Sequence, residues 1–343
     1  MRYPEFTWSF SRSTLFNDCK RKYYYYTYGK VDGWKEDADE LNKKCYFLSM
    51  LTNINFLYGS IIHQVISEAY YDYVVKGDGK DQQYYLNMAD ELWTKAELIN
   101  LDYLHGITGL SAKELQMLFL DVYKKDRSVM DNIPSYRNKT RRLLTTFFNS
   151  DFWKDIIEPG AAEHICGDCT NNRYETVELG NVKCYVLPDV VYKDKRTGRV
   201  VVIDWKTGSP KPKDIDQACF YAMAITSQYG IPREDIDIKI VYLGNNINKS
   251  DGSYPLVESV SFDQYYETVA LEYLKKTSSL MLDYVEDRES NKPLPITSFE
   301  VTQDPGNCRF CQYYDICDDS PLKAMESYNT EQNTGCRDDF FDF

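Results

Sequence analysis

A ribbon near the middle of the chain, PDVVYKDKRTGRVVVIDWK, ends in two carboxylates and an ammonium group. Asp189 lies seven residues before the Arg of an Arg-Thr step, and Asp204 lies seven residues after its Thr. A turn centred on that step would place the two carboxylates opposite each other on one face of an antiparallel strand pair. Lys206 follows Asp204 by two residues, so its side chain leaves the strand on the same face. The three charges are therefore expected to form one site.

Two carboxylates at this spacing repel each other, and the repulsion raises the pKa of one of them. A hard divalent cation such as Mg²⁺ or Mn²⁺ removes the repulsion and prefers oxygen ligands. Such an ion polarises a phosphoryl oxygen and makes bound water more acidic, and Lys206 beside it could orient the attacking water. The pattern thus indicates phosphodiester hydrolysis. The alternative is a plain surface ion pair between Asp204 and Lys206.

The elements that position these residues follow from the hydrophobic periodicity. Apolar alternation over 174–206 predicts strands. The stretch from Gly59, GSIIHQVISEAYYDYVV, has one apolar helical face, and 82–150 contains three further helical segments. A helix (KDIDQACFYAMAITSQYG), two strands (DIDIKIVYLG and YPLVESVSF) and a long helix over roughly 262–288 follow. This order predicts a mixed α/β layer with a helical insertion after the first helix.

Composition narrows the class of protein. The 343 residues fit one or two domains, and no apolar run reaches the ~18 residues that a membrane span needs. The N-terminal MRYPEFTWSFSRS lacks the apolar segment of a secretory signal, so we expect a cytoplasmic protein without a membrane partner. A net charge of −13 argues against a protein that coats nucleic acid, but not against an enzyme with a local basic channel. Ten cysteines in a reducing compartment indicate metal binding rather than disulfides.

One family combines these features. The string PD, fourteen residues and then DWK, with a strand on each side, resembles the PD-(D/E)xK nuclease superfamily. The details are similar to its RecB-like branch, which includes AddB-type nuclease domains and CRISPR-associated four-cysteine exonucleases. The resemblance implies a restriction-endonuclease-like core, a central mixed sheet flanked by helices. It also implies Mg²⁺ or Mn²⁺ as the catalytic ion.

The resemblance assigns roles to residues outside the ribbon. GSIIHQV resembles the branch's helical Gly-x-x-x-His, which would make His63 a metal ligand together with Asp189 and Asp204. QACFY resembles its Gln-x-x-x-Tyr helix. By that analogy Gln217 positions the catalytic lysine or the water, and Tyr221 contacts the nucleic-acid backbone. Taken alone, each would be an ordinary packed or surface residue.

Four cysteines lie near the two ends of the chain. Cys308, Cys311 and Cys317 are spaced C-x2-C-x5-C, and Cys19 lies almost the whole chain away. SFSRSTLFNDCKRKYYY and CRFCQYYDIC resemble the two halves of the RecB-like iron–sulfur site, so the resemblance implies a structural [4Fe–4S] cluster that joins the chain ends. Zinc and reduced core cysteines are the alternatives.

A second candidate metal set is not part of the family pattern. HICGDC supplies His164, Cys166 and Cys169, and Cys184 follows on the next expected strand. Three thiolates and an imidazole could hold zinc. The alternative is that these are buried free cysteines.

The expected architecture is an α/β core with a helical insertion and an iron–sulfur lobe that joins the two chain ends. Its parts are the N-terminal half of the iron–sulfur lobe at 1–57, the first core helix at 58–76, the helical insertion at 77–165, the nuclease core at 166–289, the C-terminal half of the lobe at 290–325 and an acidic tail at 326–343.

The expected substrate is DNA, as single strands or ends, cut by an exonuclease rather than an endonuclease. Arg141 and Arg142 in the basic run RNKTRR would line the nucleic-acid channel. The chain contains no G-x-x-x-x-G-K-[ST] phosphate loop, so a helicase or other DNA-processing subunit is an expected partner. The rival hypothesis is a catalytically silent subunit that keeps the fold and binds DNA or a protein.

Overall fold

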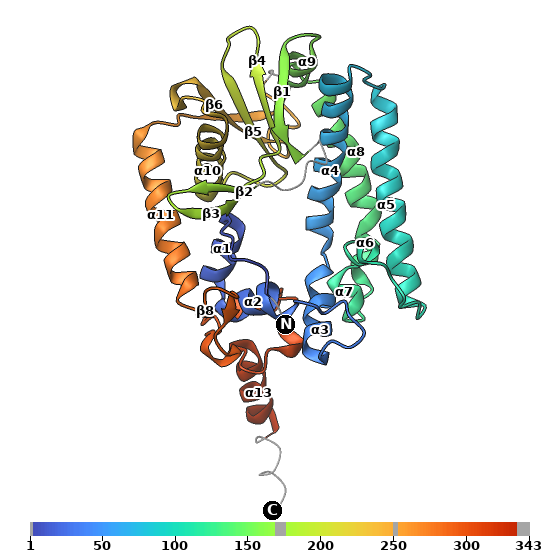
Figure 1. Ribbon diagram of the computed structural model, residues 1–343. Helices are drawn as coiled ribbons and strands as arrows, with labels where there is room; N and C mark the ends of the chain where they lie inside the picture. Colours follow the sequence, from blue (N-terminus) through green and yellow to red (C-terminus); the bar gives the residue numbers. More distant parts are fainter. Residues whose placement is uncertain (1–2, 169–175, 250–252, 335–343) are drawn as a thin grey trace, which may run out of the picture. The chain divides into compact units, whose positions relative to one another are not determined.

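The computed structural model describes residues 3–168, 176–249 and 253–334 (Figure 1). Two compact units are present. One consists of Met1–Leu51 together with Thr277–Phe343, and the other of Thr52–Lys276. No helix in the described ranges has the length and apolar character needed to cross a membrane.

A five-stranded mixed sheet forms the centre of the 52–276 unit, in the order β1-β4-β5-β6-β7 (Figure 1). Only β5 and β6 pair in parallel, and the other neighbours are antiparallel. The central strand β5 is buried from Val200 to Trp205, and its four apolar residues at 200–203 are typical of a strand covered on both faces. This mixed sheet with flanking helices is consistent with the expected restriction-endonuclease-like fold. The strands are β1 (Ala162–Gly167), β4 (Val190–Asp194), β5 (Val200–Lys206), β6 (Ile236–Tyr242) and β7 (Leu256–Val260).

Helix α10 (Pro212–Tyr229) makes the crossover that the parallel β5–β6 pair requires. A proline starts the helix, and Gly230 ends it with φ +66, a left-handed conformation that glycine adopts at little cost. A separate two-stranded ribbon, β2 (Thr176–Leu179) with β3 (Val182–Tyr185), contacts α10. The ribbon therefore covers part of the helix, whose last residues from Ser227 are exposed, while its first turns lie at the end of β5.

The helical part of the same unit is built on α4 (Ile54–Tyr70). Asn53 caps α4 by accepting from the backbone N–H groups of Asn55 and Phe56, each at 3.0 Å. Two long helices, α5 (Gln82–Leu104) and α8 (Ile133–Phe148), pack against α4 and against each other (Figure 1). The shorter helices of this part are α6 (Ala112–Leu115), α7 (Leu120–Tyr123) and α9 (Asp151–Ile157).

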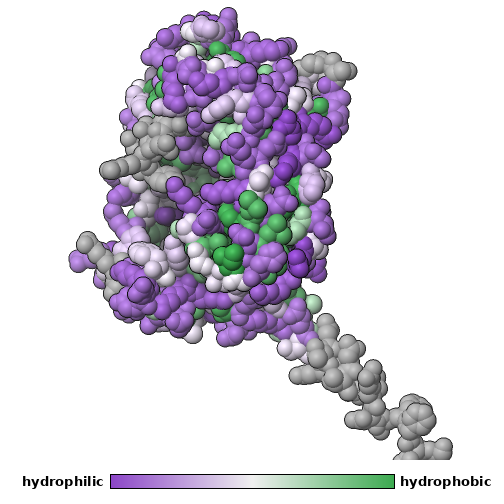
Figure 2. All heavy atoms as spheres, turned by 90° about the vertical axis from the view of Figure 1, so that its right-hand side faces the viewer, coloured by the Kyte–Doolittle hydropathy of each residue, from purple (hydrophilic) through white to green (hydrophobic). Residues whose placement is uncertain are grey.

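The outer side of α5 faces the viewer in Figure 2 and is mostly hydrophilic, with one hydrophobic patch. An open groove runs over this side, lined by α5 and α6. Leu98 lies in it with 55% of its surface exposed, among the carboxylates of Glu91, Asp102 and Glu114. Lys95 and Asp90 also line the groove, so carboxylates outnumber cations along it.

The other unit brings the two ends of the chain together around aromatic side chains. The Trp8 indole N–H donates to the Thr277 hydroxyl at 3.0 Å, and the Arg21 Nε–H donates to the Phe299 carbonyl at 2.9 Å. Tyr23 and Tyr28 are nearly fully buried, so many of the tyrosines here serve packing. The elements are α1 (Phe10–Asp18), α2 (Lys20–Tyr24), a π-helical turn (Tyr25–Gly29), α3 (Glu40–Met50), β8 (Val285–Asp287), β9 (Lys292–Pro293), α12 (Pro305–Arg309) and α13 (Pro321–Thr334), with α11 (Gln264–Leu282) running between the units in sequence.

Three boundaries differ from the sequence-based expectation. Strand β1 lies mainly within the segment expected to be helical, because its six residues, four of them half-buried, show no clear alternation and become a strand only by pairing with β4. Helix α11 ends at Leu282, where the chain turns into β8, rather than near 288. Helix α13 extends to Thr334, into the expected loose tail.

Candidate active site

The β4–β5 ribbon has the predicted register. Val190 pairs with Ile203 in an antiparallel ladder, and the next step of that ladder sets Asp189 opposite Asp204. The Trp205 backbone N–H donates to Asp189 Oδ2 at 2.7 Å, which fixes this carboxylate across the strand ends. Asp204 is only 3% exposed because its neighbours on β5 are core residues. The alternative of a surface ion pair at this strand end is therefore wrong.

Helix α4 brings a histidine to the carboxylates. A Cβ atom on Gly59 would lie 3.3 Å from the Thr207 hydroxyl, so the missing side chain lets α4 pack against the residue that follows β5. One helical turn later, His63 Nδ1 lies 3.3 Å from Asp189 Oδ1. Residues four apart lie on the same face of a helix, which is the physical sense of the Gly-x-x-x-His spacing.

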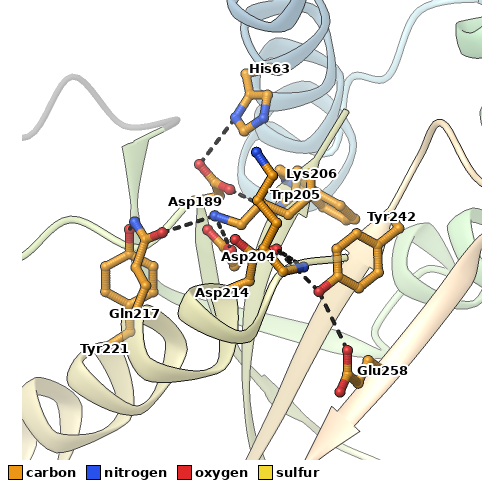
Figure 3. Close-up of polar contacts among 11 residues, drawn as sticks. His63, Asp189, Asp204, Trp205, Lys206, Asp214, Gln217, Tyr221, Tyr242 and Glu258 are labelled. Atoms are coloured by element: carbon orange, nitrogen blue, oxygen red, sulfur yellow. Dashed lines mark hydrogen bonds and ion pairs between the residues drawn. The ribbon is translucent and has the colours of Figure 1, made fainter. Parts of the chain in front are cut away.

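Lys206 is held between the carboxylates and α10 (Figure 3). Its Nζ lies 2.6 Å from Asp204 Oδ2 and donates to Gln217 Oε1 at 2.9 Å. The Gln217 amide N–H in turn donates to the Tyr221 hydroxyl at 2.6 Å. Gln217 is thus oriented with its oxygen toward the ammonium, as its expected positioning role requires.

Burial and mutual repulsion shape the titration of the site. Burial, followed by the charge of Asp189, raises the pKa of Asp204 to about 7, against the opposing effect of Lys206. Burial alone would also raise the pKa of Asp189, but His63 and the Trp205 N–H hold it below the usual range. Burial alone would lower the pKa of His63, yet the two carboxylates keep it above the ordinary value. The negative charge is therefore concentrated on Asp189.

The donor set suits a hard divalent cation, because it combines four carboxylate oxygens with one imidazole. Asp204 Oδ2 is buried and has an ion pair with Lys206 but no well-directed hydrogen bond. As they stand, no three His, Cys, Asp or Glu side chains within residues 3–168, 176–249 and 253–334 are spaced to hold a metal ion. In this structure the His63 imidazole contacts Asp189 and the Lys206 ammonium contacts Asp204. The side chains are therefore of the type that binds such an ion, but they contact one another.

Comparison with known proteins decides the family. The sequence model of the PD-(D/E)XK nuclease superfamily matches residues 7–318 of the 343. The chain belongs to that superfamily. Searches of curated proteins and of solved structures gave no match. Nucleases of this superfamily generally use divalent metals such as Mg²⁺, which agrees with the donor set at the β4–β5 end.

A second set of contacts behind this nuclease-superfamily site was not predicted from the sequence. Asp214 Oδ2 accepts from the Lys211 backbone N–H at 3.0 Å and from the Tyr242 hydroxyl at 3.3 Å. The same hydroxyl lies 3.4 Å from Glu258 Oε2 (Figure 3). These contacts join the first turn of α10 to β6 and β7, and Gln217 follows Asp214 by three residues. In the sequence, Asp214 in the first turn of a helix that starts with Pro212 was the signal that could have indicated a role for this aspartate.

Replacing Gln217 with leucine is expected to lower nuclease activity by about 10- to 100-fold, the usual loss when an outer partner of a metal-site group is removed. The leucine keeps the volume but releases the ammonium of Lys206. Single-turnover rates would fall while the substrate concentration for half-saturation changes little. Gln228→Leu, at the exposed end of α10, serves as the matched control. Equal rates in both variants would contradict a positioning role.

The four cysteines expected to bind a cluster line a single cavity. Burial raises the pKa of Cys311, and the nearby thiols of Cys19 and Cys308 add to that effect. Burial likewise raises the pKa of Cys317 to about 11, with contributions from the other three. The Cys311 backbone N–H donates to the Cys308 carbonyl at 3.1 Å, which curls the C-x2-C segment around the cavity. All four belong to the unit that contains both chain ends.

The second candidate metal set is not assembled in the described residues. His164 Nδ1 lies 3.4 Å from the Tyr70 hydroxyl, and the Cys184 thiol donates to the Val182 carbonyl at 3.3 Å. Cys166 is on β1 of the main sheet, whereas Cys184 is on β3 of the small ribbon. Cys169 lies outside the described residues. The described members therefore have packing roles, and the zinc hypothesis has no support from them.

The two predicted nucleic-acid-binding arginines have different environments. Arg141 forms a close ion pair with Asp90 of α5, so its positive charge is compensated within the helical part. Arg142 is exposed. Tyr221 is enclosed beside Gln217, and its hydroxyl accepts a hydrogen bond within the site. Its contact with a nucleic-acid backbone remains a prediction.

Proposed function

We propose that this protein is a divalent-metal-dependent deoxyribonuclease that hydrolyses phosphodiester bonds as an exonuclease, on single strands or DNA ends. The observation that supports it most is the convergence of Asp189, Asp204 and Lys206 at one strand end, with His63 and Gln217 beside them. These groups come from three separate parts of the chain, the β4–β5 ribbon, α4 and α10, and together they supply the carboxylates and the ammonium that metal-dependent phosphodiester hydrolysis uses.

His63, Asp189 and Asp204 would hold the Mg²⁺ or Mn²⁺ ion. When bound, the ion polarises the phosphoryl oxygen and makes its water a stronger nucleophile. The ammonium of Lys206, aimed by Gln217, orients the attacking water and offsets negative charge that builds up on the phosphoryl oxygens. Tyr221 holds Gln217 in place, and the buried base of the site at Asp204 strengthens these electrostatic interactions.

We also propose that the chain is of the RecB-like type and carries a structural [4Fe–4S] cluster on Cys19, Cys308, Cys311 and Cys317. Four thiols on one cavity, three of them from a short C-terminal segment, have the soft donor chemistry of such a cluster. Its role would be to fasten the first and last parts of the chain within their common unit. A reducing cytoplasm suits these cysteines, all of which are free in the described residues.

Because the sequence has no phosphate loop for nucleotide hydrolysis, we propose that a helicase or another DNA-processing subunit delivers the substrate. The acidic face along α5 limits how much DNA the chain can attract by itself. A basic partner would supply the missing attraction.

A cleavage assay tests the function. The full-length protein is incubated with end-labelled linear and with circular single-stranded DNA, with Mg²⁺, with Mn²⁺ or with EDTA, next to Lys206→Ala. The expected result is cutting of linear strands only, which is lost in EDTA and in the variant. Cutting of circles would make it an endonuclease. No cutting, or cutting that persists in Lys206→Ala, would reject the enzyme and leave the catalytically silent binding subunit.

Cation binding at the site is expected to strengthen between about pH 6 and about pH 8. The pKa of Asp204 is raised to about 7 and that of His63 is also raised, so both groups carry protons at low pH that an ion must displace. Below about pH 7 the affinity should fall about tenfold per pH unit for each proton displaced. Isothermal titration with Mn²⁺ in buffers of different ionisation enthalpy counts those protons. An affinity that does not change with pH would contradict the assignment of these ligands.

A further inference from the structure

The basic segment of α8 divides its charges between two faces. Arg137 and Arg141, four residues apart, point toward α5. Arg137 lies 3.0 Å from Glu97, and Arg141 is paired with Asp90. These two guanidinium groups therefore stabilise the packing of α8 on α5 and are not available to a ligand.

Lys139 and Arg142, three residues apart, are on the face of α8 toward α4, and both are exposed. Within the part of the chain that the structure describes, neither has an ion pair. The Lys139 ammonium lies 4.8 Å from the centre of the Tyr58 ring and 5.8 Å from that of Tyr136. Those rings meet edge to face at 5.6 Å, and the Tyr136 hydroxyl donates to Asn55 at 2.7 Å. The ammonium is thus held in place while its charge remains uncompensated.

The other cation shares the same surroundings. Tyr58 is 5% exposed, and its hydroxyl has no hydrogen-bond partner in the described residues. Burial raises the pKa of Tyr58 to about 12, and the positive charge of Arg142 acts in the opposite direction. Arg142 follows Lys139 by three residues, so both side chains leave α8 on the same face. Lys139 and Arg142 consequently form one positive cluster around Tyr58.

The position of this cluster relates it to the active site. Tyr58 directly precedes Gly59, the point where α4 meets Thr207 just after the catalytic lysine. His63 lies five residues further along the same helix, about 7.5 Å along its axis and about 140° around it. The opposite side of the helical part carries the carboxylate-lined groove over α5. A polyanion is therefore attracted along the α4–α8 side and repelled from the α5 side.

We propose that Lys139 and Arg142 bind the phosphodiester backbone of the nucleic-acid strand that enters the site at Asp189 and Asp204, an inference that rests on the proposed nuclease function. The guanidinium of Arg142 offers paired donors for phosphate oxygens, and the ammonium of Lys139 is a point charge already held by two rings. Of the two arginines predicted from the sequence to bind nucleic acid, this proposal includes Arg142 and leaves out Arg141, which is paired with Asp90. It includes Lys139 as a second binding residue.

The test measures binding without cutting. Fluorescent single-stranded DNA is titrated with the full-length protein in EDTA over a range of salt concentrations, with unlabelled DNA and RNA strands of equal length as competitors in separate arms. For Lys139→Ala with Arg142→Ala, affinity at low salt should fall about tenfold or more. The slope of log K against log salt should flatten by about 0.7 per lost phosphate contact, or about 1.4. Lys113→Ala with Lys154→Ala removes two other exposed cations of the helical part and should change neither quantity.

The outcomes separate the two proposals. Lys139→Arg with Arg142→Lys should restore most of the salt slope, and thermal unfolding should be the same in all variants because the four lysine and arginine side chains are exposed. A wild-type slope in the double alanine variant overturns the inference, even if the protein cuts DNA. A wild-type protein that neither binds nor cuts single strands overturns both the inference and the nuclease function.

Discussion

Replacing Asp204 with asparagine is expected to reduce DNA cleavage by about 1,000-fold while making the metal-free protein more stable at neutral pH. The rate falls because the carboxylate of Asp204 would both bind the proposed ion and hold the Lys206 ammonium. A 1,000-fold loss corresponds to an activation barrier higher by about 4 kcal/mol, at about 1.4 kcal/mol per factor of ten. The gain follows from burial, which together with the charge of Asp189 raises the pKa of Asp204 to about 7. When folding raises the pKa of an acid, the free energy of unfolding falls as the pH rises and the buried acid becomes charged. The asparagine amide stays neutral, so the variant avoids this loss at neutral pH.

Asp194 provides the matched control, because it is also a buried aspartate of the sheet, at the far end of β4. Its hydrogen bonds with Arg196 hold its pKa below the usual range, so its charged form stabilises the folded state. Asp194→Asn should therefore lower stability at neutral pH and leave the cleavage rate of the folded protein unchanged. Single-turnover rates and thermal unfolding in EDTA measure both effects. Wild-type cutting by the Asp204 variant would remove the active site from this position.

On the proposed cluster assignment, replacing Cys311 with serine is expected to abolish iron binding and lower the unfolding temperature of its unit by about 10 °C. The loss of a ligand for a structural centre costs several kcal/mol. Each kcal/mol shifts the midpoint by roughly 2–8 °C for domains of about 60 to 250 residues, a range that includes this unit. Cys311 lines the cavity together with the three other cysteines of the C-x2-C-x5-C and Cys19 set. Visible absorbance, analysis of iron, sulfide and zinc, and calorimetry under anaerobic conditions provide the measurements.

Cys45→Ala is the control for that change. Cys45 is fully buried in the same unit, and its sulfur packs against Gly29 rather than lining the cavity. Its removal should leave the iron content unchanged and cost only the small free energy of a shortened core side chain. If the wild-type protein contains zinc, or no metal at all, the cluster is wrong, whereas the nuclease site at β4–β5 is unaffected.

Several features of the site were determined by the sequence alone, because they depend on residues close together in the chain. The equal spacing of Asp189 and Asp204 around an Arg-Thr step set the ladder register, since a hairpin turn fixes which residues face each other. The four-residue spacing from Gly59 to His63 and from Gln217 to Tyr221 placed each pair on one helical face. The mixed α/β order was also predictable, because periodicities of 2 and 3.6 are local properties.

Only the tertiary structure decided which distant groups meet. Strand β1 exists because β4 offers it a partner, and the contacts of Tyr242 with Asp214 and Glu258 join three elements whose sequences carry no common pattern. Within the run RNKTRR, Arg137 and Arg141 pair with α5 and Arg142 does not, since adjacent residues on a helix point about 100° apart. Local sequence determines the face of its own helix or strand from which a side chain projects. The residues that this side chain contacts depend on how the elements pack, which is driven by apolar burial that no short segment can achieve alone.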